Sequence, residues 1–182
     1  MEKPPSPWSV PVAVVGIPET GQHLDIEPSE ATRAELARFA GLRDLPHLAA
    51  SFDLERRGAA VHVRGQVRAR VGQTCVVSLE PMESEIDEPV EVTFAPQPER
   101  GEAGESAAAE HHLSEAEEEP PEPLIGGTID LGALATEFMV LGIDPYPRKP
   151  GATFTPPNVG DEGAHPFAAL AALKKRPGGS RS

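Results

Sequence analysis

One run of basic side chains has the pattern of a phosphate-binding surface. Between positions 61 and 71 the odd-numbered residues are apolar or small, so a strand would place the even-numbered residues together on its other face. Guanidinium groups bind phosphate through paired hydrogen bonds, and Arg56 and Arg57 precede this run. We name the even-numbered set the basic stripe: His62, Arg64, Gln66, Arg68 and Arg70. The pattern predicts contact with the phosphates of an RNA.

A structural role for the basic stripe is the alternative. Carboxylates occur on the segment before it, at Asp53 and Glu55, and on the segment after it, at Glu85, Asp87 and Glu91. Across from arginines in a sheet, these groups would form cross-strand ion pairs. No aromatic residue interleaves with the arginines to stack on a base, which favours the ion pairs over RNA binding.

The residues that could bind a metal lack the partners that a site needs. Cys75 is the only cysteine, and one thiolate cannot complete the four ligands of a zinc ion. His111 and His112 lie in an acidic stretch with no predicted structure to fix their geometry. We therefore expect no metal and no cofactor, and we interpret Cys75 as a buried thiol at the end of a strand.

The chain shows no pattern typical of catalysis. It contains no glycine-rich phosphate loop, no nucleophile arranged with a histidine or cysteine, and no carboxylate pair on a recognisable scaffold. We expect a protein that is not an enzyme and has no small-molecule substrate.

The basic stripe needs a sheet to position it, and residues 9–95 contain alternating apolar runs that predict one. Arg57-Gly58 offers a turn between two such runs, which predicts an antiparallel hairpin. Leu36, Phe39 and Ala40 form the expected inner side of a helix. The predicted elements are strands at 10–14 and 22–27, a helix at 30–40, and strands at 48–55, 61–71 and 88–94.

A second helix is predicted after Asp130, which can cap its first turn. Its apolar residues recur three or four apart, and prolines at 145, 147 and 150 prevent it from continuing beyond Gly142. The expected apolar face consists of Leu131, Leu134, Phe138 and Leu141. We favour a core helix docked on the sheet over a helix that binds a partner's groove.

Charge is distributed unevenly along the chain, whose formal net charge is −13. Residues 96–123 contain one Lys or Arg against nine Asp and Glu, or −8, and almost no large apolar side chains. Such a segment cannot bury enough surface to offset the entropy of ordering, so we predict a disordered acidic linker. It could compete with RNA, hold a basic protein, or only improve solubility.

A short amphipathic helix is predicted near the C-terminus, from His165 to Arg176. Phe167, Leu170 and Leu173 form one side of it, and its last turn is basic. A helix of this length needs a surface to fold on, either in this chain or on a partner.

Three stretches resemble the YceD family: TCVVSLEPM at residues 74–82, TIDLGALATEFMVLGIDPYPRKPGATF at 128–154, and HPFAALAALKKR at 165–176. The resemblance extends over most of residues 9–176 in the same order. Bacterial and plastid members are associated with accumulation of large-subunit ribosomal RNA, so the resemblance implies a role in ribosome production. Members can also carry a second cysteine at the position of Ser78, and in this chain that pair is broken.

Together these patterns predict an α+β fold, in which an antiparallel sheet of several strands packs with two or three helices and is interrupted by the acidic linker. The expected segments are a sheet with one helix at 9–95, the linker at 96–123, a helix with a proline-rich tail completing the same domain at 124–154, and a tether with a basic helix at 155–182.

Two functions remain open. The first is a non-enzymatic ribosome-biogenesis factor that supports accumulation or processing of large-subunit ribosomal RNA, by binding RNA or an assembly intermediate. The alternative is an acidic module or chaperone for a basic ribosomal protein. No apolar run is long enough for a signal peptide or a membrane span, so we expect a cytoplasmic protein. The residues expected to contact RNA or a partner are Arg56, Arg57, Arg64, Arg68, Arg70, Arg148, Lys149, Phe167, Leu170, Lys174, Lys175 and Arg176.

Overall fold

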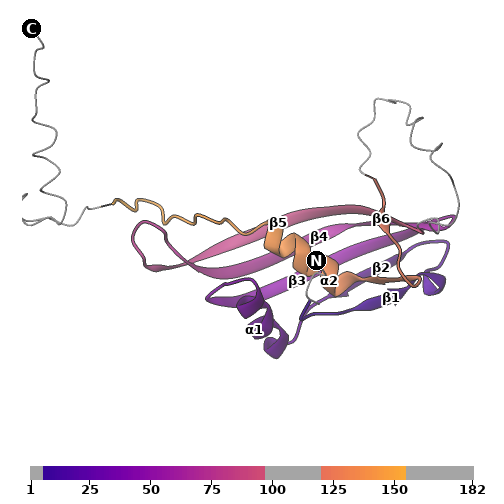
Figure 1. The fold of residues 1–182 in the computed structure, drawn as a ribbon, viewed down its shortest axis with the longest axis horizontal. Helices are drawn as coiled ribbons and strands as arrows, with labels where there is room; N and C mark the ends of the chain where they lie inside the picture. Colours follow the sequence, from indigo (N-terminus) through magenta and orange to yellow (C-terminus); the bar gives the residue numbers. More distant parts are fainter. Residues whose placement is uncertain (1–5, 97–119, 155–182) are drawn as a thin grey trace, which may run out of the picture.

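Three long antiparallel strands form the frame of the fold (Figure 1). The computed structural model describes residues 6–96 and 120–154. The three strands are β3 (Asp44–Arg57), β4 (Ala60–Thr74) and β5 (Pro81–Ala95). β2 (Gln22–Ile26) extends the sheet antiparallel to β3, and β6 (Glu122–Pro123) extends it parallel to β5. With two α-helices in the described residues, the predicted α+β class is confirmed.

The predicted hairpin is confirmed, and its register explains which side chains face the core. Leu54 pairs with Val63 and Phe52 pairs with Gly65, so the apolar residues of both strands lie on one face. β5 begins at Pro81, well before the expected start at Glu88, because its acidic residues alternate with Met82, Ser84 and Ile86 and pair with the polar face of β4.

Helix α1 (Glu30–Phe39) begins where Ser29 caps it, with the Thr32 N–H donating to the Ser29 hydroxyl over 3.2 Å. Leu36 and Ala37 are buried against the sheet, while Phe39 is 43% exposed. The prediction that Phe39 faces inward was wrong, because the helix packs through Leu36 and the small Ala37 and leaves the neighbouring ring at its outer side.

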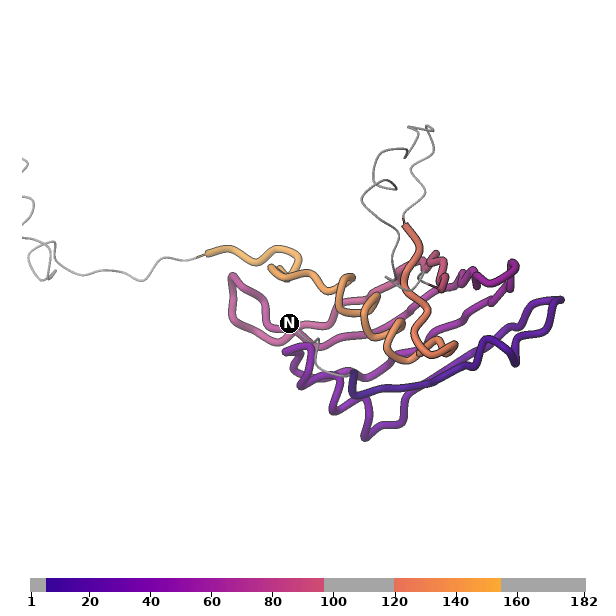
Figure 2. Tube along the Cα trace, turned by 45° about the vertical axis from the view of Figure 1, so that its right-hand side comes forward, coloured from indigo at the N-terminus to yellow at the C-terminus, as the bar shows by residue number. Residues whose placement is uncertain are grey.

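Helix α2 (Leu131–Leu141) lies across the apolar face of the sheet, as Figures 1 and 2 show, which confirms a core helix. Leu131, Leu134 and Met139 are buried. Phe138 is half-buried and Leu141 is 73% exposed, so the expected apolar face was wrong at its last residue. The helix is rotated so that Met139 faces the core, and its final turn passes toward the edge of the sheet.

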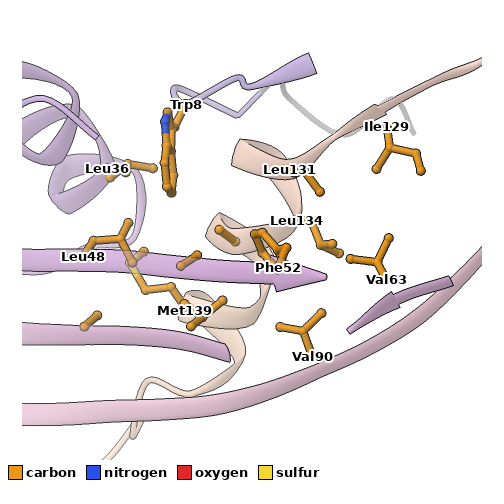
Figure 3. Packing of buried hydrophobic residues seen from close by; sticks show 14 of the residues in the cluster. Trp8, Leu36, Leu48, Phe52, Val63, Val90, Ile129, Leu131, Leu134 and Met139 are labelled. Atoms are coloured by element: carbon orange, nitrogen blue, oxygen red, sulfur yellow. The ribbon is translucent and has the colours of Figure 1, made fainter. Parts of the chain in front are cut away.

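A second, two-stranded sheet closes the other side of the core. In it β1 (Pro11–Ala13) pairs antiparallel with β7 (Thr128–Asp130). The expected opening strand is therefore shorter than predicted, and Val14 begins the 3-10 helix η1 (Val14–Gly16). The buried side chains of both sheets and both helices form one cluster (Figure 3), in which Trp8 lies near α1 and Phe52 near α2.

Asp130 joins three parts of the fold. Its carboxylate accepts the Ala133 N–H over 3.0 Å, which caps α2 as predicted, and also the Val10 N–H over 2.8 Å and the Ser9 hydroxyl over 2.6 Å. Burial raises the pKa of this carboxyl, but the hydrogen bonds from Ser9, Val10, Ala133 and Gly132 prevail and hold the pKa below its ordinary value of 3.8.

Replacing Asp130 with alanine is expected to lower the free energy of unfolding at pH 7 by about 1–2 kcal/mol, because a helix cap is lost. A carboxyl with a lowered folded pKa stabilises the fold above its unfolded pKa, near 3.8, and this contribution is lost as the pH falls through the lower folded value. The deficit of the variant, measured by urea denaturation, should therefore shrink in this acidic range. A loss of stability that does not change with pH would show that the ionised carboxylate is not its cause. Asp130→Asn, which retains an acceptor for the cap, is the control.

Two predictions cannot be compared with the structure. The main part of the expected acidic linker falls on residues 97–119, and the expected tether and C-terminal helix fall on residues 155–182. Both lie outside the described residues, as do His111 and His112.

Candidate functional site

The basic stripe lies on the face of the sheet that points away from the core. In the register of β4 and β5, Arg64 lies opposite Glu91 and Arg68 lies opposite Asp87. The Arg64 Nη2 is 3.1 Å from Glu91 Oε1, and the Arg68 Nε is 3.2 Å from Asp87 Oδ1. Both guanidinium groups are thus already paired with carboxylates, so the ion pairs predicted toward β5 are confirmed at Glu91 and Asp87 but not at Glu85.

The other residues of the basic stripe differ in their partners. Gln66 donates a hydrogen bond to Asp87, and His62 is hydrogen-bonded to Thr93 over 3.1 Å. Arg70 lies opposite Glu85 in the register, yet within residues 6–96 and 120–154 it has no carboxylate within ion-pair distance.

The ion pairs predicted toward β3 are wrong. Asp53 lies opposite Arg64 in the register but is hydrogen-bonded to His23 of β2, with 2.7 Å between Oδ1 and Nδ1. This bond, together with the charges of Asp53 and nearby Asp25, raises the pKa of His23 above its ordinary value of 6.5. Glu55 pairs with Arg57 at the hairpin turn, over 2.9 Å. The reason is that β2 supplies Asp53 with a closer partner than β4 does.

The remaining predicted contact residues do not converge on one surface. Arg56 lies at the turn between β3 and β4, with its Nη2 3.9 Å from Glu19 Oε1. Arg148 is exposed beyond α2, and the Lys149 ammonium is 2.9 Å from Glu80 at the opposite end of the hairpin. The other five lie outside the described residues: Phe167, Leu170, Lys174, Lys175 and Arg176.

Cys75 directly follows β4 and its thiol is buried, which confirms its structural interpretation. The backbone N–H of Lys149, together with the Ser78 hydroxyl and N–H, lowers the pKa of the thiol from 9.0 to about 6, although burial raises it. The Pro147 carbonyl also accepts the Val76 N–H over 2.9 Å. These bonds attach the proline-rich tail to the end of the sheet. Among the described residues, no group of three metal-ligating side chains occurs.

Beside the basic stripe, β5 presents a row of carboxylates that sequence reasoning treated only as counter-ions. The odd-numbered residues of this strand share its outer face, so the sheet edge carries negative charge along most of its length. We call this set the acidic row: Glu83, Glu85, Asp87 and Glu91. Three carboxylates of the acidic row lie opposite the three arginines of the basic stripe, and Glu83 lies opposite Gly72, so the outer face of this pair of strands has one more carboxylate than arginine.

A groove of about 1070 Å³ runs between β5 and α2, close to β6. Its apolar lining consists of Val92 and Phe94 from β5 and Leu134, Phe138 and Leu141 from α2, and its polar lining includes Arg64 and Glu91. We call this the β5–α2 groove. The sequence marked these apolar residues as inward-facing, but no pattern in it indicated that α2 would leave the edge of the sheet uncovered.

Comparison with known proteins identifies the family. Residues 63–174, more than half of the chain, match the family described as "Large ribosomal RNA subunit accumulation protein YceD". The chain belongs to the YceD family. The YceD match begins within β4 and includes β5, α2 and the tail, and therefore most of the basic stripe, the acidic row and the β5–α2 groove. The family's name connects this YceD protein with the accumulation of large-subunit ribosomal RNA.

No curated protein and no solved structure matches this YceD chain significantly. Among its described residues, no helix has both the length and the apolar character to span a membrane.

The double substitution Arg64→Ala and Arg68→Ala is expected to lower the free energy of unfolding by about 0.5–2 kcal/mol, because exposed ion pairs contribute about 0.2–1 kcal/mol each. The deficit, measured by urea denaturation, should become smaller at high ionic strength, which screens exposed charges. Arg70→Ala is the matched control and should be nearly neutral. Equal destabilisation by Arg70→Ala would show that the ion pairs are not the cause.

Proposed function

We propose that this YceD protein is a non-enzymatic ribosome-biogenesis factor of the cytoplasm, which supports accumulation of large-subunit ribosomal RNA by holding a basic protein component of an assembly intermediate. The observation that carries the proposal is the pairing of the basic stripe with the acidic row. Because the carboxylates outnumber the arginines there, the surface attracts a cationic partner more than a phosphate backbone.

Direct RNA binding through the basic stripe would be costly. A phosphate reaching Arg64 or Arg68 would have to replace Glu91 or Asp87, and it would then lie beside other carboxylates of the acidic row. RNA affinity also comes from cations that release condensed counter-ions, and the whole chain has a net charge of −13. Both features favour a protein partner.

The absence of catalysis is part of the proposal. The nearest resemblance to a catalytic arrangement is His62, which is hydrogen-bonded to Thr93 and has its Nε2 3.4 Å from Glu91 Oε1. The contact with Glu91 lacks hydrogen-bond geometry, and Glu91 is also paired with Arg64. In such an arrangement Thr93 would be the nucleophile, His62 the base and Glu91 the third group that orients the base. Because Glu91 makes no hydrogen bond to His62, the base is not oriented.

The test is removal of the protein from cells, followed by measurement of mature large-subunit relative to small-subunit ribosomal RNA. The large-subunit RNA should fall, and both the wild-type chain and the triple variant Arg64→Ala, Arg68→Ala, Arg70→Ala should restore it. A pull-down with the full chain should retain a basic protein after nuclease treatment. An unchanged ratio of large-subunit to small-subunit ribosomal RNA after removal would refute the proposal. The proposal would also fail if the triple variant did not restore the large-subunit RNA and nuclease abolished binding in the pull-down, because both results would indicate direct RNA contact.

A further inference from the structure

We propose that the open edge of β5 binds an extended segment of another protein by adding it as a strand, and that this segment alternates basic and apolar side chains. The assignment of that protein to ribosome assembly rests on the proposed function. The binding mode itself rests on the backbone of β5, on the acidic row and on the β5–α2 groove.

The edge of β5 is open for most of its length. On one side the strand pairs with β4 from Pro81 to Phe94. On the other side, within the described residues, only β6 pairs with it, at Phe94 and Ala95. A strand edge of this kind presents unpaired N–H and C=O groups that can pair with an added chain.

The orientation of these backbone groups follows from Ala95. Its carbonyl accepts the Leu124 N–H over 2.8 Å, so the odd-numbered residues of β5 direct their backbone groups toward the open edge. Thr93 and Glu91 therefore offer donors there. Pro89 is also odd-numbered, and proline is tolerated at an edge because its missing N–H would face away from the sheet. Pro89 therefore discourages pairing between two copies of the chain, while the other backbone groups of the edge remain available to a partner strand.

The two sides of the open edge differ in chemistry. Side chains of an added strand would alternate between the outer face and the core face. On the outer face they would lie beside Glu91 and Asp87 of the acidic row. Arg64 and Arg68 contact only the Oε1 and Oδ1 atoms of these carboxylates, so Oε2 and Oδ2 remain as acceptors for a lysine or arginine of the added strand. On the core face they would enter the β5–α2 groove beside Phe94, Phe138 and Leu141, which favours apolar residues. The fitting partner is thus a strand with basic residues on one face and apolar residues on the other.

The length of the partner strand is limited at both ends. Gly142, just after α2, packs so closely on β5 that a Cβ there would lie 2.6 Å from Ile86 Cγ2 and 2.8 Å from Glu88 Cγ, which closes the groove at that end. β6 closes it at Phe94. The space between corresponds to about five or six residues of strand, or roughly 17–20 Å.

Segments of this chain fit the site less well than a basic partner does. A second copy would place one acidic row against another. Residues 96–123 carry one cation against nine carboxylates, so they would also be repelled. In residues 165–176 the large apolar side chains recur every third residue, which does not match the two-residue period of a strand.

The first experiment measures binding of a fluorescent seven-residue peptide of alternating lysine and valine to the full chain, by anisotropy. One control peptide has the same composition with the valines contiguous, and another carries N-methyl groups on alternate amides. We expect the alternating peptide to bind at least about tenfold more tightly than either control, because alternation supplies the side-chain match and free amides supply the ladder. Equal binding of all three would show simple charge attraction and overturn the proposal.

Two pairs of variants locate the site. Glu91→Pro and Glu91→Gln both remove the carboxylate, but only the first removes the edge N–H, so it should bind the peptide about five- to tenfold more weakly than Glu91→Gln. Leu141→Ser and Ile125→Ser each replace an exposed apolar residue, but only Leu141 lines the groove, so only the first should weaken binding. If the two variants differ in peptide binding in neither pair, the proposed site is wrong. The N-methylated peptide tests the same hydrogen bonds on the wild-type chain, should Glu91→Pro not fold.

The outcomes separate the binding mode from the function. If the alternating peptide binds as expected but cells lacking the protein keep normal large-subunit RNA, the proposed function fails and the strand-addition site stands. If large-subunit RNA falls on removal but Glu91→Pro and Leu141→Ser restore it fully, the site fails as the functional one. Self-association of the wild-type chain that Glu91→Pro abolishes would identify a second copy as the occupant and overturn the proposal.

Discussion

Replacing Phe52 with alanine is expected to lower the free energy of unfolding by about 3–5 kcal/mol, because it removes a large, fully buried side chain and leaves a cavity. Phe52 is 0% exposed and belongs to the cluster that joins the sheet to α2 (Figure 3). Neighbouring side chains cannot easily fill the space, because Leu48 and Leu54 are held by the pairing of β3. Equilibrium denaturation in urea measures the change.

The matched control for this prediction is Phe154→Ala. Phe154 is 72% exposed, so its removal should change the free energy of unfolding by no more than about 0.5 kcal/mol. A similar loss for both variants would mean that Phe52 does not have the central position assigned to it.

Replacing Gly65 with alanine is expected to cost about 1–3 kcal/mol of unfolding free energy, because a larger residue has no space there. An added Cβ would lie 2.1 Å from the Ser51 carbonyl oxygen and 2.6 Å from Phe52 Cδ1. The ring could move, but the Ser51 oxygen belongs to the backbone of β3, so the strands themselves would have to shift.

Gly16→Ala is the control for this second prediction, since an added Cβ at Gly16 meets no atom within 4 Å. Denaturation of both variants should show a loss at Gly65 only. Combining Gly65→Ala with Phe52→Ala should cost less than the sum of the two, because removal of the ring relieves part of the crowding. Strict additivity would show that Phe52 and Gly65 do not contact each other as the structure has them.

Local patterns predicted the parts of the fold that depend on neighbours in sequence. Asp130 marked the start of α2, because a cap acts within one turn. The two-residue alternation predicted β3 and β4 and the face of the basic stripe. Phe39 and Leu141 were assigned wrongly because the spacing of apolar residues shows that a helix has an inner side, whereas the angle at which it packs is set by distant elements.

The features that the sequence did not predict are contacts between distant segments. Asp53 has carboxylate chemistry suited to Arg64, but the arrival of β2 beside β3 gives it His23 instead. The same holds for the candidate site, in which the alternation placed Val92 and Phe94 inward without indicating that α2 leaves them beside an open edge. An open sheet edge arises from the order of all strands in the sheet, and the pattern of one strand does not reveal that order.

The hydrogen bonds of Asp130 have a consequence for synthesis of the chain on the ribosome. Val10 and its neighbours leave the exit tunnel early, yet their partners in β7 and α2 are translated some 120 positions later. At about 5–20 residues per second, the N-terminal strand waits for roughly 6–24 s before its partner is made. During that interval the nascent polypeptide exposes Trp8 and the core face of the hairpin, so co-translational chaperones should contact it there.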